Sequence, residues 1–143
     1  MKLIPIDPGN RVKDPAFLIE KCEEMYSVYT DYYQKNGFHL PWVGYFIFNE
    51  GIVKGVCGFT GAPAEGKVEI AYNTFEDYQG TGVAKKAGLL LMDIVKQQDV
   101  KYKVFAKTAP ELNASTKILE GLGFIKKGVV QDHEIGDAWM WEF

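Results

Sequence analysis

The chain has 143 residues, of which 47% are hydrophobic and 24% are charged, a composition that indicates a soluble, folded protein. The length fits one domain spanning residues 1–143 that buries its core without disulfides or metals. A net charge of −3 argues against nonspecific nucleic-acid binding, which requires a basic surface. No apolar run approaches the ~20 residues of a membrane span, and the first residues lack a signal-peptide pattern, so we expect a cytoplasmic protein. Cys22 and Cys57 have no metal-ligand spacing, which predicts reduced, buried thiols and no metal site.

The first half of the chain predicts a strand, a helix and a hairpin. Leu3–Ile6 is a candidate short strand. Asp14, followed by proline, predicts a helix start, and apolar and aromatic residues then recur at three- and four-residue steps until Asn36 and Gly37 end the pattern. Residues 42–48 and 52–60 flank an Asn-Glu-Gly turn and predict a β-hairpin.

The second half alternates strand-like and helix-like segments. The expected elements are a strand at 67–74, a helix at 83–98, a strand at 101–107, a helix opening at Pro110 and running through Gly121, and a closing hairpin of 124–131 with 137–143. The full order, β-α-β-β-β-α-β-α-β-β, predicts an α/β or α+β class.

The turn Gln79–Ala84 lies between the predicted strand and the start of the next helix. A glycine-bearing turn at this place presents free backbone N–H groups at the positive end of the helix dipole, which suits a phosphate or pyrophosphate. Gly-Thr-Gly also makes ordinary strand-to-helix turns. The turn lacks the Gly-Lys-Ser/Thr of a Walker A loop and the third glycine of a dinucleotide-binding loop.

Two segments together carry a family resemblance. The first reads Glu-Ile-Ala-Tyr at 69–72 and continues with Tyr-Gln-Gly-Thr-Gly-Val-Ala at 78–84. The second reads Asn-Ala-Ser-Thr at 113–116 and Leu-Glu-Gly-Leu-Gly-Phe at 119–124. The pair resembles the GNAT superfamily of acyl-CoA-dependent N-acyltransferases, and in motif it is closest to the ribosomal-protein-alanine N-acetyltransferase type. The resemblance implies a mixed, largely antiparallel central sheet of about seven strands flanked by helices.

The resemblance also implies acetyl-CoA as the cosubstrate. The backbone of the glycine turn would hold the pyrophosphate, and the main chain of the preceding strand would pair with the pantetheine arm. Lys85 either contacts a phosphate or lies on a solvated face, and Asn113 serves as a cofactor contact, a helix N-cap or both. The implied cofactor residues are Tyr72, Asn73, Thr74, Gln79, Gly80, Thr81, Gly82, Val83, Ala84, Lys85 and Asn113.

Transfer to an amine requires that the amine lose a proton. Glu69 is the first candidate base, because it is out of phase with its apolar neighbours and occupies a strand position where several members of the family carry a catalytic acid. The alternative is a strand glutamate that faces solvent or pairs with a lysine. Many members place a tyrosine, the usual acid, where this chain has Leu119, so Ser115 or water would protonate the leaving thiolate.

The acceptor site is expected along the aromatic stripe of the first helix and the segment after it. Tyr29, Tyr33 and Trp42 are the candidate substrate contacts, with core packing as the alternative role. The predicted function is transfer of an acetyl group from acetyl-CoA to a primary amine in a ternary complex. The alternative is a sensor or regulatory domain that binds acyl-CoA without turnover. We expect an amine acceptor, no nucleic-acid or membrane partner, and a monomer or homodimer.

Overall fold

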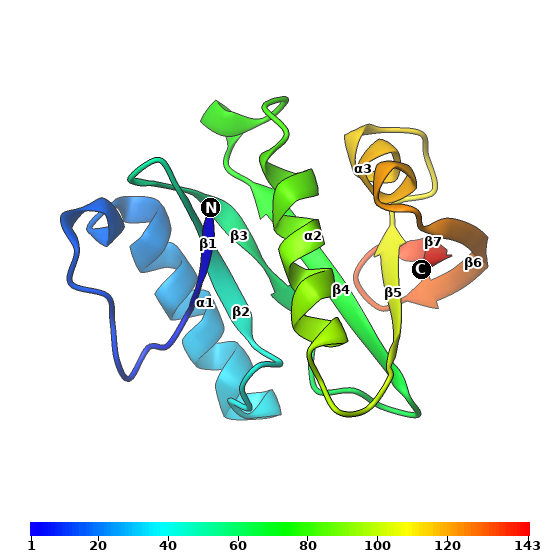
Figure 1. The fold of residues 1–143 in the computed structure, drawn as a ribbon, viewed down its shortest axis with the longest axis horizontal. Helices are drawn as coiled ribbons and strands as arrows, with labels where there is room; N and C mark the ends of the chain where they lie inside the picture. Colours follow the sequence, from blue (N-terminus) through cyan, green and yellow to red (C-terminus); the bar gives the residue numbers. More distant parts are fainter.

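The computed structural model describes all 143 residues (Figure 1). In chain order the elements are β1 (Lys2–Pro5), α1 (Glu20–Asn36), β2 (Gly44–Asn49), β3 (Ile52–Phe59), β4 (Lys67–Thr74), α2 (Val83–Lys96), β5 (Lys103–Thr108), α3 (Ala114–Leu122), β6 (Ile125–Asp132) and β7 (Gly136–Glu142). Short 3₁₀ turns lie at Pro15–Phe17 and Glu76–Tyr78. This order confirms the predicted succession of strands and helices. None of the helices is long and apolar enough to cross a membrane.

The strands form one seven-stranded sheet in the order β1-β2-β3-β4-β5-β7-β6. Every neighbouring pair is antiparallel except β4 and β5, which are parallel. The mixed, largely antiparallel sheet expected from the sequence is therefore confirmed. The strand at 67–74 has the predicted bounds, because its alternation of buried and exposed side chains is regular.

The two parallel strands pair only at their beginnings. Lys67, Val68 and Glu69 of β4 face Lys103, Val104 and Phe105 of β5, and no pair follows Glu69. Beyond that point the strands diverge toward the end of the molecule where α2 begins and α3 lies (Figure 1). The sheet is thus split into two halves that are joined at one end and open at the other.

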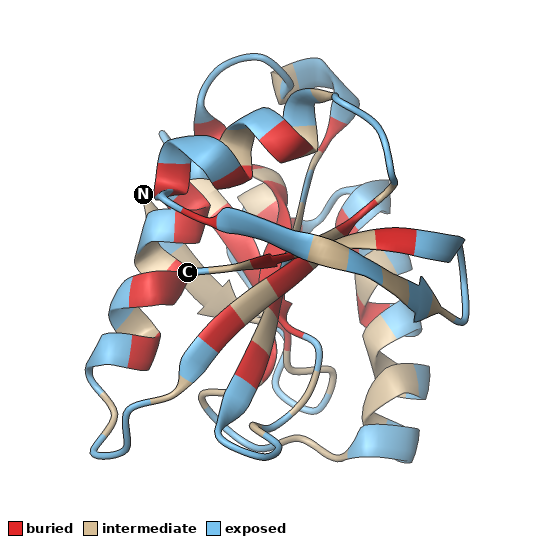
Figure 2. Ribbon diagram, turned by 90° about the vertical axis from the view of Figure 1, so that its right-hand side faces the viewer, coloured by how far each residue is buried: buried red, intermediate tan, exposed pale blue.

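Helices cover both faces of the sheet. Figure 2 shows the sheet between the two longer helices, with buried residues along the strands and on the inner sides of the helices. Helix α2 packs on β3 and β4 within the larger core, which includes Val68, Ile70 and Leu91. Helix α1 packs on the other face within a smaller core around Tyr26 and Phe46. Each β4 side chain therefore faces either α2 or α1, depending on its position along the strand.

The first helix begins later than predicted. Asp14 caps a turn by accepting a hydrogen bond from the Ala16 N–H at 2.9 Å, but the chain is extended again at Ile19 and α1 begins only at Glu20. The break places Phe17 against Phe46 and Phe48, with ring centroids 5.5 and 5.2 Å apart. The predicted stripe therefore belongs to two elements, because Phe17 fills the core ahead of the helix.

The third helix also begins later than predicted. Pro110 lies in the preceding loop, and α3 starts at Ala114 after the N-cap residue Asn113. The Asn113 side chain accepts from the Thr116 N–H at 3.2 Å, and the Asn113 N–H donates to the Thr116 hydroxyl at 3.0 Å. This reciprocal capping box satisfies backbone donors at Asn113 and Thr116 and places the helix start after Asn113.

Candidate active site

The loop between β4 and α2 contains two left-handed glycines. Gly80 has φ +76° and Gly82 has φ +80°, a backbone region that favours glycine. A β-carbon at either position would meet no atom within 4 Å, so the backbone conformation and not lack of space requires glycine. Gly82 gives α2 no side-chain cap, and the backbone N–H groups of Val83, Ala84 and Lys85 donate no hydrogen bond. The start of α2 therefore presents free donors.

Side chains of the loop hold its shape from within. The Thr81 hydroxyl donates to the backbone carbonyl of Tyr78, and the Gln79 amide donates to the carbonyl of Thr74 at 3.3 Å. These bonds engage both side chains inside the loop. The Thr81 hydroxyl proton and one N–H of the Gln79 amide are therefore engaged within the loop.

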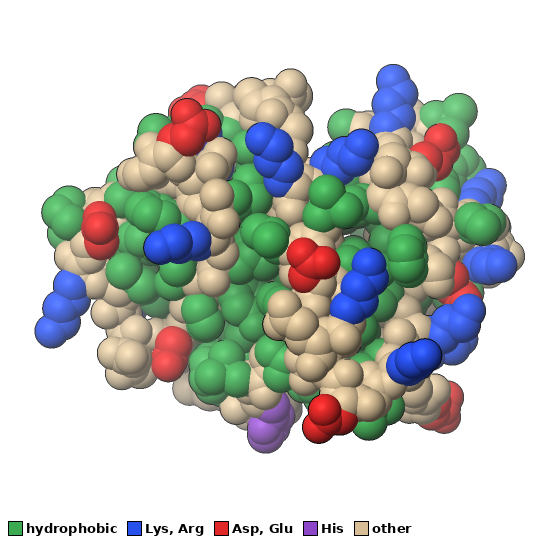
Figure 3. Space-filling view, in the orientation of Figure 1, with side chains coloured by type: hydrophobic (Ala, Val, Ile, Leu, Met, Phe, Trp, Pro, Cys, Tyr) green, Lys and Arg blue, Asp and Glu red, His purple; other side chains and the backbone are tan.

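A cleft of about 420 Å³ lies in front of these donors, and we name it the α2–α3 cleft. Nine of the eleven predicted cofactor residues line it; Thr81 and Asn113 do not. Its lining residues are Tyr72, Asn73, Thr74, Tyr78, Gln79, Gly80, Gly82, Val83, Ala84, Lys85, Ala114, Ser115, Lys117 and Ile118. Figure 3 shows basic side chains beside a hollow at the edge of the molecule where α2 begins. Lys85 and Lys117 supply positive charge at this cleft, so its donors and charges suit a pyrophosphate.

A second cavity of about 260 Å³ lies where β4 and β5 diverge, and we name it the splay cavity. Its lining comes from the two strands and from the segment that leads into α3, including Asn113 and Ser115. Because β4 has no β5 partner beyond Glu69, its backbone polar groups on this side are available to an extended ligand.

Ser115 lies between these two cavities and lines both. Its backbone carbonyl accepts a hydrogen bond from the Tyr72 hydroxyl at 3.0 Å. Burial raises the pKa of Tyr72, so this hydroxyl remains a donor at neutral pH. Asn113 acts as the N-cap of α3 and also faces the splay cavity, so the structure is compatible with both of its predicted roles. Leu119 is fully buried in the core between the sheet and the helices and supplies no proton donor.

Glu69 faces the α1 side of the sheet at the last paired position before the strands diverge. Its Oε1 atom accepts a hydrogen bond from the Thr60 hydroxyl at 2.7 Å. The Lys107 Nζ atom lies 3.9 Å from the same oxygen and 3.5 Å from Asp132 Oδ2. The Glu69 side chain is 19% exposed, and its carboxylate is oriented by the bond from Thr60.

A third cavity of about 290 Å³ lies between α1 and the strands β3 and β4, and we name it the α1 groove. Its lining residues are Met25, Val28, Tyr29, Tyr32, Val56, Cys57, Gly58, Phe59, Thr60, Ala71, Tyr72 and Asn73. Tyr29 is the one predicted substrate contact among them. Tyr33 accepts a hydrogen bond from the Gly44 N–H at 3.1 Å, and Trp42 packs between Phe59 and Tyr102, so both lie outside the groove.

The three cavities meet on one short segment of β4. Tyr72 lines all three, Asn73 lines the α2–α3 cleft and the α1 groove, and Ala71 lines the splay cavity and the α1 groove. A ligand in the cleft and a second ligand in the groove would thus approach each other at Ala71–Asn73 from opposite sides of the sheet.

Some lining residues were not predicted from the sequence. Lys117 follows Asn113 by one helical turn, and that spacing is the signal that could have found it. Thr60 and Tyr32 give no such signal, because they depend on the β3–β4 register and on the distance of α1 from the sheet.

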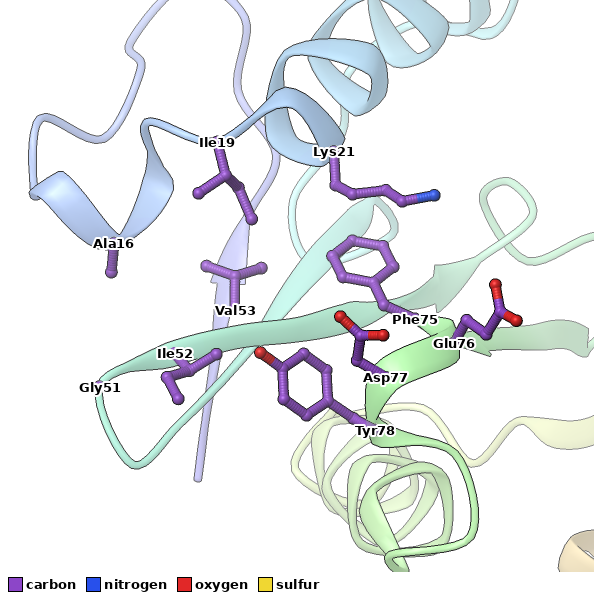
Figure 4. Close-up of a pocket in the computed structure, with 10 residues that line it drawn as sticks. All are labelled: Ala16, Ile19, Lys21, Gly51, Ile52, Val53, Phe75, Glu76, Asp77 and Tyr78. Carbon is purple, nitrogen blue, oxygen red and sulfur yellow. The ribbon is translucent and has the colours of Figure 1, made fainter.

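A further cavity of about 360 Å³ lies near the start of α1 (Figure 4). Apolar side chains of Ile19, Ile52, Val53 and Phe75 face into it, and Asp77 and Lys21 lie at its edge (Figure 4). It shares only Tyr78 with the α2–α3 cleft and contains none of the predicted site residues.

The family model described as "Acetyltransferase (GNAT) domain" matches residues 10–125. The matched region includes the glycine loop, both diverging strands and α3. The chain therefore belongs to the GNAT acetyltransferase family, as its two motifs predicted.

A relative from Bacillus agrees with this assignment. An uncharacterized N-acetyltransferase p20 from Bacillus licheniformis is 35% identical over 83 residues, which are 57% of this chain and 47% of that protein. The match thus spans about half the length of that relative.

Three solved structures share the fold. An acetyltransferase from Salmonella typhimurium that modifies the N-terminal serine of ribosomal protein L7/L12 gives a TM-score of 0.72 at 18% identity, covering 99% of this chain and 92% of that one. A chimera of spermidine N-acetyltransferase from Vibrio cholerae gives 0.70 at 14% identity, covering 100% and 95%. The ribosomal-protein-S5-alanine acetyltransferase from Vibrio fischeri gives 0.65 at 19% identity, covering 94% and 76%.

Proposed function

We propose that this chain moves an acetyl group from acetyl-CoA to a primary amine by direct transfer in a ternary complex. The observation that carries the proposal is the meeting of the α2–α3 cleft, the splay cavity and the α1 groove at Ala71–Asn73. Two ligands that enter from opposite faces come together there, which is the arrangement that direct transfer needs.

The residues of the cleft fit acetyl-CoA. Free N–H groups at the start of α2 would hold the pyrophosphate, with Lys85 and Lys117 as counter-charges. The main chain of Tyr72, Asn73 and Thr74 would pair with the pantetheine arm along the open side of β4. When bound, acetyl-CoA supplies a thioester whose C–S bond breaks as the amine nitrogen bonds to the acetyl carbon, leaving an amide and a thiolate.

The chain's own residues would accept the amine proton, polarise the thioester carbonyl and protonate the leaving thiolate. Glu69, held by Thr60, takes the proton that the amine must lose, directly or through water. A backbone N–H near Asn73 would polarise the carbonyl oxygen of the thioester. Ser115 or water returns a proton to the thiolate, since Leu119 cannot.

Buried Leu119 is also the observation that favours a second candidate, a domain that binds acyl-CoA without turnover. Thermal-shift titration with CoA and acetyl-CoA tests the cleft, and absence of any shift would reject both candidates. Thiol release from acetyl-CoA in the presence of an amine panel separates them, because only the enzyme produces thiol in step with amide.

A further inference from the structure

Polar side chains mark the two ends of the α1 groove: Asn73 lies opposite Val56 at one end, and Thr60 follows Phe59 at the other. Its floor is made of cross-strand neighbours, among them Gly58 opposite Ala71, which are small enough to leave space beneath α1. Nine of its twelve lining residues are hydrophobic, so most of its length offers contact to an apolar ligand.

Tyr32 carries an unusual hydroxyl in this groove. The oxygen is buried and has no hydrogen-bond partner. A buried polar group without a partner costs free energy, so nearly all such groups in folded proteins are satisfied by protein, water or ligand. Burial, and secondarily the Glu69 carboxylate, raise the pKa of Tyr32, which therefore keeps its proton at neutral pH.

The hydroxyl lies at the end of the groove where the candidate base is. A β-carbon on Gly61 would be 3.8 Å from the Tyr32 oxygen, and the neighbouring residue Thr60 donates to Glu69 at 2.7 Å. Tyr32 and Thr60 thus lie at the end of the groove next to Glu69, so a ligand nitrogen at this end would have a hydroxyl and a carboxylate in its neighbourhood.

The charges around the groove suit a single amino group. No acidic residue lines the groove, and Glu69 at its end shares Lys107 with Asp132. The acidic residues of α1, which are Glu20, Glu23, Glu24 and Asp31, are exposed and do not line it either. A polyamine would place its further positive charges against apolar side chains, at a cost in desolvation.

We propose that Tyr32 binds the amino group of the acceptor and that the acceptor is a monoamine with an apolar body, such as an arylalkylamine, whose body lies along the α1 groove. This inference rests on the proposed acetyl transfer and names its acceptor class. Tyr32 accepts a hydrogen bond from the amine and places the nitrogen beside Glu69.

The test compares 2-phenylethylamine with spermidine as acceptors in the acetyl-CoA thiol-release assay. We expect kcat/KM for 2-phenylethylamine to exceed that for spermidine by at least about tenfold. The variant Tyr32→Phe should raise the KM for 2-phenylethylamine by about tenfold, through the lost hydrogen bond, and leave the thermal shift with CoA unchanged. Its own Tm should equal or exceed that of the parent, because the variant removes a buried unpaired hydroxyl.

The matched control is Tyr45→Phe, which loses a hydroxyl that donates to Pro41 O at 2.7 Å on the other side of the sheet. It should leave the amine KM unchanged. Unchanged amine kinetics in Tyr32→Phe would overturn the role of Tyr32, and a preference for spermidine would overturn the acceptor class while acetyl transfer itself stands.

Saturation-transfer NMR of 2-phenylethylamine on the CoA-loaded protein tests binding apart from turnover. A signal that weakens in Tyr32→Phe but not in Tyr45→Phe supports the site. Absence of a signal from the parent protein overturns it. Absence of thiol release with every amine, together with CoA binding, rejects the proposed acetyl transfer instead.

Discussion

The Tyr72 hydroxyl donates to the Ser115 carbonyl at 3.0 Å and so joins β4 to the first turn of α3. The two residues are 43 positions apart in sequence, and both line the α2–α3 cleft. This bond sets the distance between two walls of the cleft, because it is the one side-chain hydrogen bond that connects β4 with α3.

Replacing Tyr72 with Phe removes that connection while keeping the ring. We expect the free energy of unfolding to fall by about 1 kcal/mol and the affinity for CoA to fall by up to about tenfold. Urea denaturation and CoA titration measure the two effects. A loss of stability with unchanged CoA affinity would show that the bond supports the fold and not the cleft.

The glycine loop gives a second prediction, with a control of the same backbone geometry. Gly82→Ala forces a side chain into φ +80°, at a cost of about 1–2 kcal/mol, and should weaken CoA binding as the loop relaxes. Gly66 has φ +75° and equally open surroundings in the β3–β4 loop, outside the cleft. Gly66→Ala should lose similar stability yet bind CoA as the parent does; equal CoA affinities in both variants would contradict the role of the loop.

If Glu69 is the general base, its replacement should reduce turnover without weakening CoA binding. Glu69→Gln keeps an oxygen that accepts from Thr60 but cannot take a proton, so kcat should fall by about 100-fold while CoA affinity stays within about twofold. Glu65→Gln, at an exposed position in the β3–β4 loop, is the matched control for loss of one charge. Retained turnover in Glu69→Gln would reject this residue as the base.

High pH should weaken the fold through its buried tyrosines. Burial raises the pKa of both Tyr33 and Tyr45 to about 12, from an ordinary value of 10.0. A raised folded-state pKa contributes stability that is fully present below pH 10 and is lost as the pH rises toward 12. Urea midpoints should therefore stay level between pH 7 and about 9 and fall above pH 10, together with the appearance of tyrosinate absorbance. A midpoint that is flat through pH 11 would contradict the burial of these hydroxyls.

The two cysteines should be unreactive in the folded protein. Burial raises the pKa of the Cys22 thiol to about 11 and raises that of Cys57 as well, and both side chains are inaccessible. Thiolate is the reactive form, so a disulfide reagent at pH 8 should titrate neither group in buffer and both in denaturant. Fast reaction of either cysteine in buffer would contradict this prediction and would indicate that the hydrophobic cluster around that cysteine unfolds locally.

The sequence predicts those elements whose bounds are set by neighbouring residues, and it fails where a bound is set by a contact distant in sequence. The strand at 67–74 and the start of α2 follow from alternation and from a glycine turn, and both were predicted to the residue. The start of α1 was not, because Phe17 leaves the helix to pack against β2, a contact distant in sequence. Lys107 near Glu69 is likewise a consequence of the sheet order and not of any spacing within a motif.

The acceptor side was the least predictable for the same reason. Tyr29, Tyr32 and Tyr33 lie within one helical stripe. The sequence gives no sign that the Tyr33 hydroxyl binds the Gly44 N–H while Tyr32 lines a groove. Contacts with the sheet decide this: Gly44 approaches the Tyr29 ring and donates to Tyr33, whereas the small residues Gly58 and Ala71 lie in the floor of the groove.

The position of β7 has a consequence for how the chain is made. β7 comes after β5 and β6 in the sequence but lies between them in the sheet. A nascent chain that has left the ribosome only as far as β6 can fold α2 and the glycine loop, yet its β5 has only the three pairs with β4 to hold it. The second wall of the site is therefore assembled last, by contacts of long sequence separation, and ligand binding should appear only after β7 has emerged.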